Sequence, residues 1–212
     1  MADILIDNEA QPSNPSSSKS LIYVDNTMKR LVHLNDVPYH STMNLQNAST
    51  ASVSAGYATD TYLAGSSIVV PAGYWQAGTL YYCEFDMTKT AAGTAQAILT
   101  LRMGTAGTTA DASIASQTYT AGTGAADTGF WQVWALFRSV GSGTSAVIQL
   151  NTLINKTLTS TGLINSTNIT LMTLTTSSGF NSTTQTTIGL SFNGGSAFSG
   201  TNTFVISQLS GI

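Results

Sequence analysis

Two carboxylates carry the most suggestive chemistry in the sequence. Glu84 and Asp86 lie two residues apart within Leu80–Met87, where polar and apolar residues alternate. Such residues share one face of a β-strand, with their Cα atoms about 7 Å apart. A carboxylate pair of this kind can catalyse glycoside hydrolysis. We favour the alternative of a solvated outer face, with Arg102 on the next predicted strand as a partner.

Nucleophilic catalysis has little support. The two histidines, His33 and His40, both precede the region of regular alternation, so a Ser-His-Asp site would need one of them to fold back across the domain. The sequence contains no G-x-S-x-G, H-E-x-x-H, P-loop or dinucleotide-binding motif. We therefore predict that the protein is not an enzyme.

Metal binding is a second alternative. Asp111 and Asp127 could join backbone carbonyls around Ca²⁺, which needs several oxygen ligands. Acidic residues in loops more often cap turns, and we expect that role here. Cys83 is the only cysteine, so no intrachain disulfide can form, and we expect it to be a small buried apolar residue. No cofactor is expected.

Charge is unusually scarce. Only 8% of residues are charged, against about 25% in an average globular protein, whereas the hydrophobic fraction of 42% is sufficient for a packed core. Residues 157–212 carry no ionisable side chain and are rich in Ser and Thr. The net charge is −3 and Lys29–Arg30 is the only adjacent basic pair, which argues against nucleic-acid binding.

No targeting signal is evident. Met1–Asp7 lacks the basic start and apolar run of a signal peptide. No stretch approaches the roughly 20 apolar residues of a membrane span. We expect a protein that is made in a cytoplasm and does not contact a membrane.

The first 56 residues are predicted to form an extended arm, a hairpin and a tether. Gln11–Ser18 is a Pro/Ser-rich linker. Leu21–Val24 and Arg30–Leu34 flank a turn and predict a short hairpin, which is marginally stable alone in water and should rest on another surface. Pro38–Ser54 is expected to be irregular. Apolar residues suited to strand addition at a partner's sheet edge are Ile4, Leu5, Ile6, Leu21, Ile22, Val24 and Leu31.

Residues 57–212 are predicted to form an all-β domain. Alternation with a period of two recurs from about Tyr57 onward, and no window shows helical periodicity with caps. About nine strands separated by Gly/Ser/Thr/Asn loops indicate an antiparallel β-sandwich or jelly roll. The apolar rows expected in its core include Tyr81–Met87, Ala97–Met103, Trp131–Phe137, Ile148–Ile154 and Ile188–Phe192.

Aromatic residues offer a third kind of site. Tyr74, Tyr81, Tyr82, Trp131 and Trp134 are expected mainly in the core, although such a set can also form a sugar-binding platform. Trp75 lies in a Pro/Gly-rich turn, and we expect it to be exposed at a contact.

Two stretches resemble virion proteins of tailed bacteriophages. Pro12-x-x-Pro15, Ser18–Asp25 (SKSLIYVD) and Lys29–Leu31 resemble the Pro-rich turn and paired strands with which phage head and tail proteins often open. Further along, the sequence resembles the opening strands of jelly-roll modules in phage capsid-decoration, head-fibre and minor tail proteins, at Asp60–Ser66, Pro71–Gly73, Ala77–Thr79 and Lys89–Thr94.

The resemblance implies a structural protein of the virion. Its arm would dock on the major capsid protein or another virion protein, as in a capsid decoration or cement protein, and its sandwich would form a homo-oligomer, with a trimer favoured. The alternatives are a head or tail fibre that binds a host glycan and a carbohydrate-active enzyme or its binding module.

Overall fold

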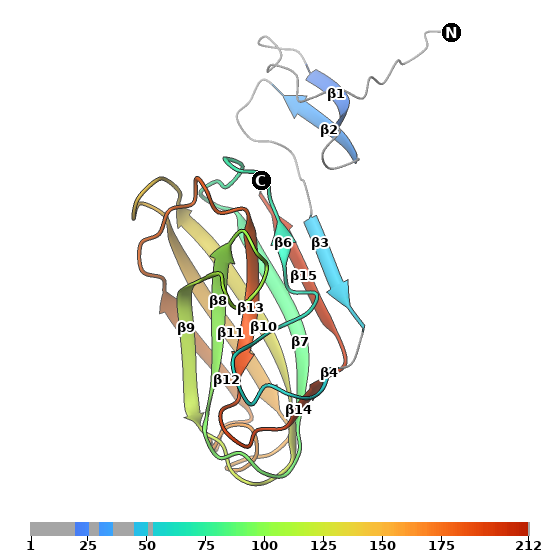
Figure 1. Ribbon diagram of the computed structural model, residues 1–212, viewed down its shortest axis with the longest axis vertical. Coiled ribbons are helices and arrows are strands. Elements are labelled where there is room, and N and C mark those ends of the chain that lie inside the picture. The colour runs from blue at the N-terminus through green and yellow to red at the C-terminus, as the bar shows by residue number, and fades with distance from the viewer. Residues whose placement is uncertain (1–19, 26–29, 36–44, 51–52, 212) are drawn as a thin grey trace, which may run out of the picture.

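The computed structural model describes residues 20–25, 30–35, 45–50 and 53–211. Within this part of the chain every regular element is a β-strand, and all strand pairings are antiparallel. Two sheets lie against each other as a sandwich (Figure 1). The prediction of an all-β antiparallel sandwich is therefore confirmed.

The larger sheet has eight strands. From one edge, the order is β12, β11, β10 and β7. On its other side β7 pairs with both β14 and β15. β14 pairs in turn with β4, and β15 pairs with β3. The strands are β3 (Leu45–Ser49), β4 (Val53–Gly56), β7 (Leu80–Lys89), β10 (Asp127–Ser139), β11 (Val147–Lys156), β12 (Thr170–Thr176), β14 (Gly200–Asn202) and β15 (Val205–Ser210).

The smaller sheet has five strands, with β13 paired to β8, and β8 paired to the edge strand β9. Two short strands, β5 and β6, share the other side of β13. The bounds are β5 (Thr61–Tyr62), β6 (Ile68–Val69), β8 (Gln96–Gly104), β9 (Ala112–Ala121) and β13 (Thr187–Asn193).

The core fills the space between the two sheets. Phe85 of β7 stacks on Trp131 of β10 with ring centroids 5.3 Å apart. Phe192 of β13 meets both rings edge-on from the opposite sheet. The apolar rows predicted on β7, β8, β10 and β11 are buried as expected, because one face of each strand points into this layer.

β13 departs from the simple alternation, because both of its faces are covered. Ile188, Leu190 and Phe192 are buried as expected, but Thr187 and Ser191, which alternate with them, are buried as well. Tyr62 lies over the outer side of Gly189, where an added Cβ would come within 1.9 Å of the Tyr62 hydroxyl. Ser66 exchanges hydrogen bonds with the backbone of Leu190. The segment from β5 to β6 thus pairs along the edge of β13, and Tyr62 covers part of its outer side.

Two further expectations are corrected. Pro38–Ser54 was expected to be irregular, yet β3 pairs with β15 and β4 with β14, so the larger sheet begins before Tyr57. These strands are short and show no clear apolar alternation, and their pairing depends on partner strands some 150 residues away. Strands β9 and β12 were not among the apolar rows of the prediction.

The predicted N-terminal hairpin is confirmed. β1 (Ser20–Asp25) and β2 (Arg30–Asn35) pair in a register that places Val24 opposite Leu31, and they form a two-stranded sheet of their own. Of the predicted contact residues, Leu21, Ile22 and Val24 lie on β1 and Leu31 on β2. Ile4, Leu5 and Ile6 lie outside the described residues.

Two leucine-to-alanine variants test the packing. Leu101 is fully buried, and its replacement should lower the free energy of unfolding by about 2–5 kcal/mol. Leu136 is 42% exposed, so the same change there should cost about 1 kcal/mol or less. Urea titrations of both variants measure the difference, and equal losses would contradict the assigned core.

Candidate functional site

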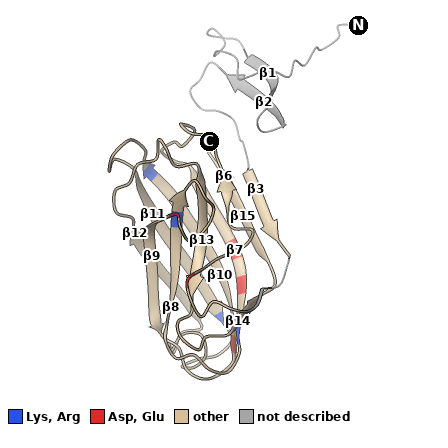
Figure 2. Cartoon of the chain, viewed as in Figure 1, with Lys and Arg blue, Asp and Glu red and all other residues tan. Residues whose placement is uncertain are grey.

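Charged residues are sparse in the sandwich, as the colouring of Figure 2 shows. Most of their side chains bind the chain's own loops. Arg102 forms an ion pair with Asp60 and donates to two loop carbonyl oxygens. The expected partnership of Arg102 with Glu84 or Asp86 is therefore wrong. Arg102 lies on the outer side of the smaller sheet, whereas the two strand carboxylates lie on the outer side of the larger one.

Glu84 and Asp86 serve separate hydrogen-bond networks. Asp86 accepts bonds from the backbone N–H groups of Thr203 (2.7 Å) and Phe204 (3.0 Å) and from the Thr203 hydroxyl, and so it fixes the turn between β14 and β15. Glu84 accepts from the Tyr82 hydroxyl and from the Gln132 amide at 2.8 Å. This arrangement favours the structural interpretation of the pair over the hydrolytic one.

Asp111 and Asp127 cap loops, as expected. Asp111 accepts three bonds from the successive backbone N–H groups of residues 105–107. Asp127 accepts from the backbone of Thr128, Leu158 and Leu163 and from the Thr157 hydroxyl, at 2.7–3.1 Å. Within the described ranges, no group of three or more His, Cys, Asp or Glu side chains is placed to hold a metal ion.

Two lysines also stabilise loops through side-chain hydrogen bonds. Lys89 and Lys156 are almost fully buried. The Lys89 ammonium donates to the carbonyl oxygens of Thr123 and Ala125, and that of Lys156 to those of Leu158 and Ser166. Burial lowers the pKa of Lys89, and the nearby Asp127 carboxylate opposes that change. Both lysines thus hold the loops at one end of the sandwich.

Cys83 is an apolar core residue, as expected. Its side chain is fully buried, and burial raises the pKa of the thiol to about 12. Of the two histidines, His33 lies on β2 and His40 lies outside the described residues. The part of the chain that the structure describes contains no helix that could cross a membrane.

Asp127 provides a direct test of the loop-capping role. Replacing it with Ala leaves the buried N–H of Leu163 and other donors without an acceptor, so we expect a loss of about 2–4 kcal/mol in unfolding free energy. The melting temperature of the unchanged protein should be the same in EDTA and in CaCl₂. A calcium-dependent shift would show that the carboxylate holds a metal ion instead.

The aromatic residues divide between core and surface. Trp75 was expected to be exposed, but only 4% of it is accessible. Its ring stacks on Phe137 at 4.7 Å, and its indole N–H donates to the carbonyl oxygen of Gln185 at 2.7 Å. That expectation is wrong because the turn folds onto the end of the core. Tyr81 and Trp131 are also buried.

Tyr82 and Trp134 remain partly accessible on the outer side of the larger sheet. They are opposite one another on β7 and β10, with ring centroids 5.6 Å apart. Partial burial and the hydrogen bond to Glu84 raise the pKa of Tyr82 to about 12. Together with Glu84 and Gln132 they place two aromatic rings beside an amide and a carboxylate.

We call this side of the larger sheet the outer face. It carries most of the large apolar side chains that are exposed in the described chain, namely Leu136, Met172, Leu174 and Ile206. Cross-strand rows run through it, one joining Leu174, Asn151, Trp134 and Tyr82, and the next joining Met172, Leu153, Gln132 and Glu84. Sequence reasoning missed Met172 and Leu174, although their spacing of two residues is a signal for one shared face.

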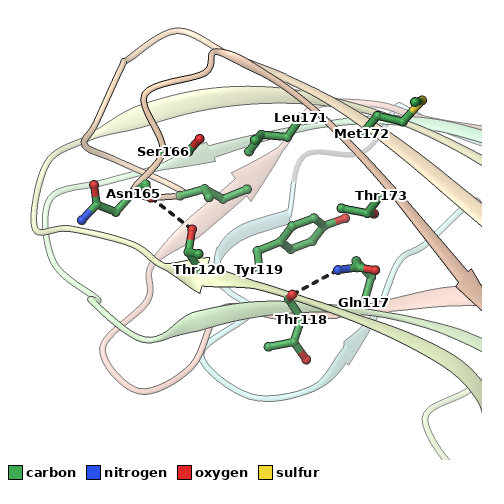
Figure 3. Close-up of a pocket in the computed structure, with 10 residues that line it drawn as sticks. Gln117, Thr118, Tyr119, Thr120, Asn165, Ser166, Leu171, Met172 and Thr173 are labelled. Atoms are coloured by element: carbon green, nitrogen blue, oxygen red, sulfur yellow. Dashed lines mark hydrogen bonds between the residues drawn. The ribbon is translucent and has the colours of Figure 1, made fainter.

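A groove of about 270 Å³ lies between the edge strands β9 and β12 (Figure 3). Its walls are crossed by side-chain bonds: Thr175 donates to Gln117 at 2.8 Å, and the Tyr119 hydroxyl bonds to Thr152 at 3.0 Å. The buried Tyr119 has a pKa raised to about 12 by its loss of solvation. The first bond joins β12 to β9 of the opposite sheet, and the second joins β11 to β9.

Comparisons with known proteins place the chain in no family. No family model and no curated protein matches it. Among solved structures, a chain of infectious bursal disease virus, Gx strain, is 9% identical over 87% of this chain and 45% of its own length, with a TM-score of 0.27. A chain of the Gt strain is 10% identical over 99% and 44%, with a TM-score of 0.16. This chain spans less than half the length of either, and scores this low assign no function.

Proposed function

We propose that this protein is a non-enzymatic structural component of a virus particle, which attaches to the particle through its N-terminal segment. The observation that supports this most is the separate sheet formed by β1 and β2. A two-stranded hairpin is at best marginally stable in water without a surface to pack on. A partner surface would supply that packing.

The position of β3 in the larger sheet fits the same role. β3 pairs with β15 alone and forms one margin of the larger sheet. Leu45, the first residue of β3, therefore lies at the margin of the sandwich rather than at its centre. An N-terminal segment joined at this margin would be suited to strand addition on a neighbouring protein.

The sequence supplies the more specific part of the proposal. The resemblance of short motifs within Pro12–Leu31 and within Asp60–Thr94 to tailed-phage proteins favours a capsid decoration or cement protein. Its partner would be the major capsid protein or another virion protein, with assembly onto the particle after synthesis in the host cytoplasm. The low charge of the sandwich is consistent with contacts made by apolar and backbone groups.

A truncated chain that begins at Leu45 tests the attachment. It keeps β3, so it should fold with nearly the melting temperature of the full chain, but it should not sediment with particles prepared without the protein. A start at Tyr57 would be unsuitable because it removes β3 and β4. Particle binding by the Leu45 chain would place the attachment in the sandwich instead.

Salt provides an independent check on the full chain. At about 1 M salt the Debye length is only about 3 Å, so an apolar and backbone contact should persist while an electrostatic one weakens. We expect the protein to remain bound to particles under these conditions. Release at moderate salt would show that charged groups carry the attachment.

A second candidate function, glycan binding by a head or tail fibre, is favoured by one observation. Tyr82 and Trp134 lie side by side on the outer face, next to the Gln132 amide. Aromatic rings beside polar groups offer the mixture of apolar and hydrogen-bonding contacts that a sugar ring needs. The notable feature is that Trp134 remains accessible while the other two tryptophans are buried.

Replacing Trp134 with Ala separates the two functions. If the outer face binds a glycan, the variant should lose at least tenfold in affinity, about 1.4 kcal/mol, for any glycan that the unchanged protein captures on an array. Val69→Ala, an exposed apolar change on the smaller sheet, is the control and should have no effect. If the unchanged protein binds no glycan on the array but still binds particles, the result would support attachment and reject glycan binding.

A further inference from the structure

β12 is an edge strand with an open side. It pairs only with β11. The N–H of Ser177 donates to Ile148 and the carbonyl oxygen of Ile169 accepts from Lys156, so odd-numbered residues direct their backbone groups toward β11. In an antiparallel ladder the residues between them direct theirs to the other side. The N–H and C=O groups of Thr170, Met172, Leu174 and Thr176 therefore face the open edge.

This edge lacks the features that normally prevent strand pairing. Folded proteins protect exposed edges with charges, prolines, bulges or short strands. β12 has seven residues, contains no charge, Pro or Gly, and keeps an unbroken register with β11. Met172 and Leu174 project from it with 80% and 69% of their surfaces exposed. In Figure 3, Met172 points away from Tyr119, whereas Thr173 points toward it.

The edge is also held in place. Thr175 is bonded to Gln117 of β9, and Thr173 is bonded to Thr152, whose hydroxyl also contacts Tyr119. A strand fixed in this way loses little conformational freedom when a partner strand pairs with it. The open edge is therefore suited to binding without rearrangement.

The chemistry of the edge matches a second copy of itself. An antiparallel pair of β12 strands related by a two-fold axis at Thr173 puts Met172 opposite Leu174 of the other copy, and Thr170 opposite Thr176. Each of the four residues with open backbone groups then lies opposite one such residue of the other copy. Because each of these antiparallel pairs exchanges two N–H···O bonds, the contact would contain about eight hydrogen bonds. The two exposed apolar side chains of each copy meet on the outer face, and residues 157–212 bring no charge to the contact.

We propose that two copies of this chain pair through β12 in this register and join their larger sheets into one continuous sheet. This inference does not rest on the proposed function, because it concerns the free protein. It predicts a two-fold dimer, in place of the trimer expected from the sequence.

Paired charge variants test the contact and its register. Full-length Met172→Lys/Leu174→Lys and Met172→Glu/Leu174→Glu should each be monomeric by light scattering, because like charges would lie opposite one another. Mixed at low salt, the two variants should form a heterodimer. For the unchanged protein, light scattering in a concentration series from about 1 µM to about 1 mM should give the mass of a dimer. Val69→Lys, an equally exposed apolar position on the smaller sheet, should leave the dimer intact.

Cysteine cross-linking tests the register of the two β12 strands without adding charge. Under mild oxidation, an equimolar mixture of the Met172→Cys and Leu174→Cys proteins should form a disulfide-linked dimer, whereas each variant alone should not. The buried Cys83 should not interfere. A monomeric or trimeric unchanged protein, a dimer insensitive to both double variants, or cross-links within one variant alone would overturn the proposal.

Discussion

The packing of two sheets through one apolar layer governs the rest of this structure. Phe85 and Trp131 stack within the larger sheet, and Phe192 meets them from the smaller one. Because each strand must present alternate residues to this layer, its other residues are directed to the outside. The same constraint that builds the core therefore decides which residues reach the outer face, where Trp134 and Tyr82 lie in one cross-strand row between Asn151 and Gln208.

The few charges of the sandwich stabilise its loops. Asp86, Asp111 and Asp127 accept several bonds each from loop donors, and Lys89 and Lys156 donate to loop carbonyl oxygens. A charge that is held by several hydrogen bonds within the fold is worth more than one on an open surface. A chain with so little charge thus still has well-fixed loops, and its surface relies on hydroxyl, amide and apolar groups.

The sequence predicted those strands in which apolar and polar residues alternate because one face is buried. β7, β8, β10 and β11 alternate clearly because each buries one complete face. β3 and β12 lie at sheet margins, where burial is partial, so neither sequence shows a clear alternation. β3 depends in addition on a partner, β15, that is distant in the sequence. Trp75 was misjudged for a related reason: the sequence shows that it is in a turn, but not that the turn folds back onto Phe137. On the outer face, no signal short of the strand register brings Tyr82 beside Trp134.

The proposed β12 contact and the strands that follow the N-terminal segment lie at opposite ends of the larger sheet. β12 is its first strand, whereas β3 and β4, which follow the N-terminal segment, lie beyond β7 and its partners at the other end. Pairing through β12 would therefore leave β3 and β4 of each copy outside the contact. A dimer built in this way presents two attachment segments, and a particle with repeated binding sites can engage both. The second attachment then occurs at high effective concentration, so a modest affinity for each arm suffices for stable binding.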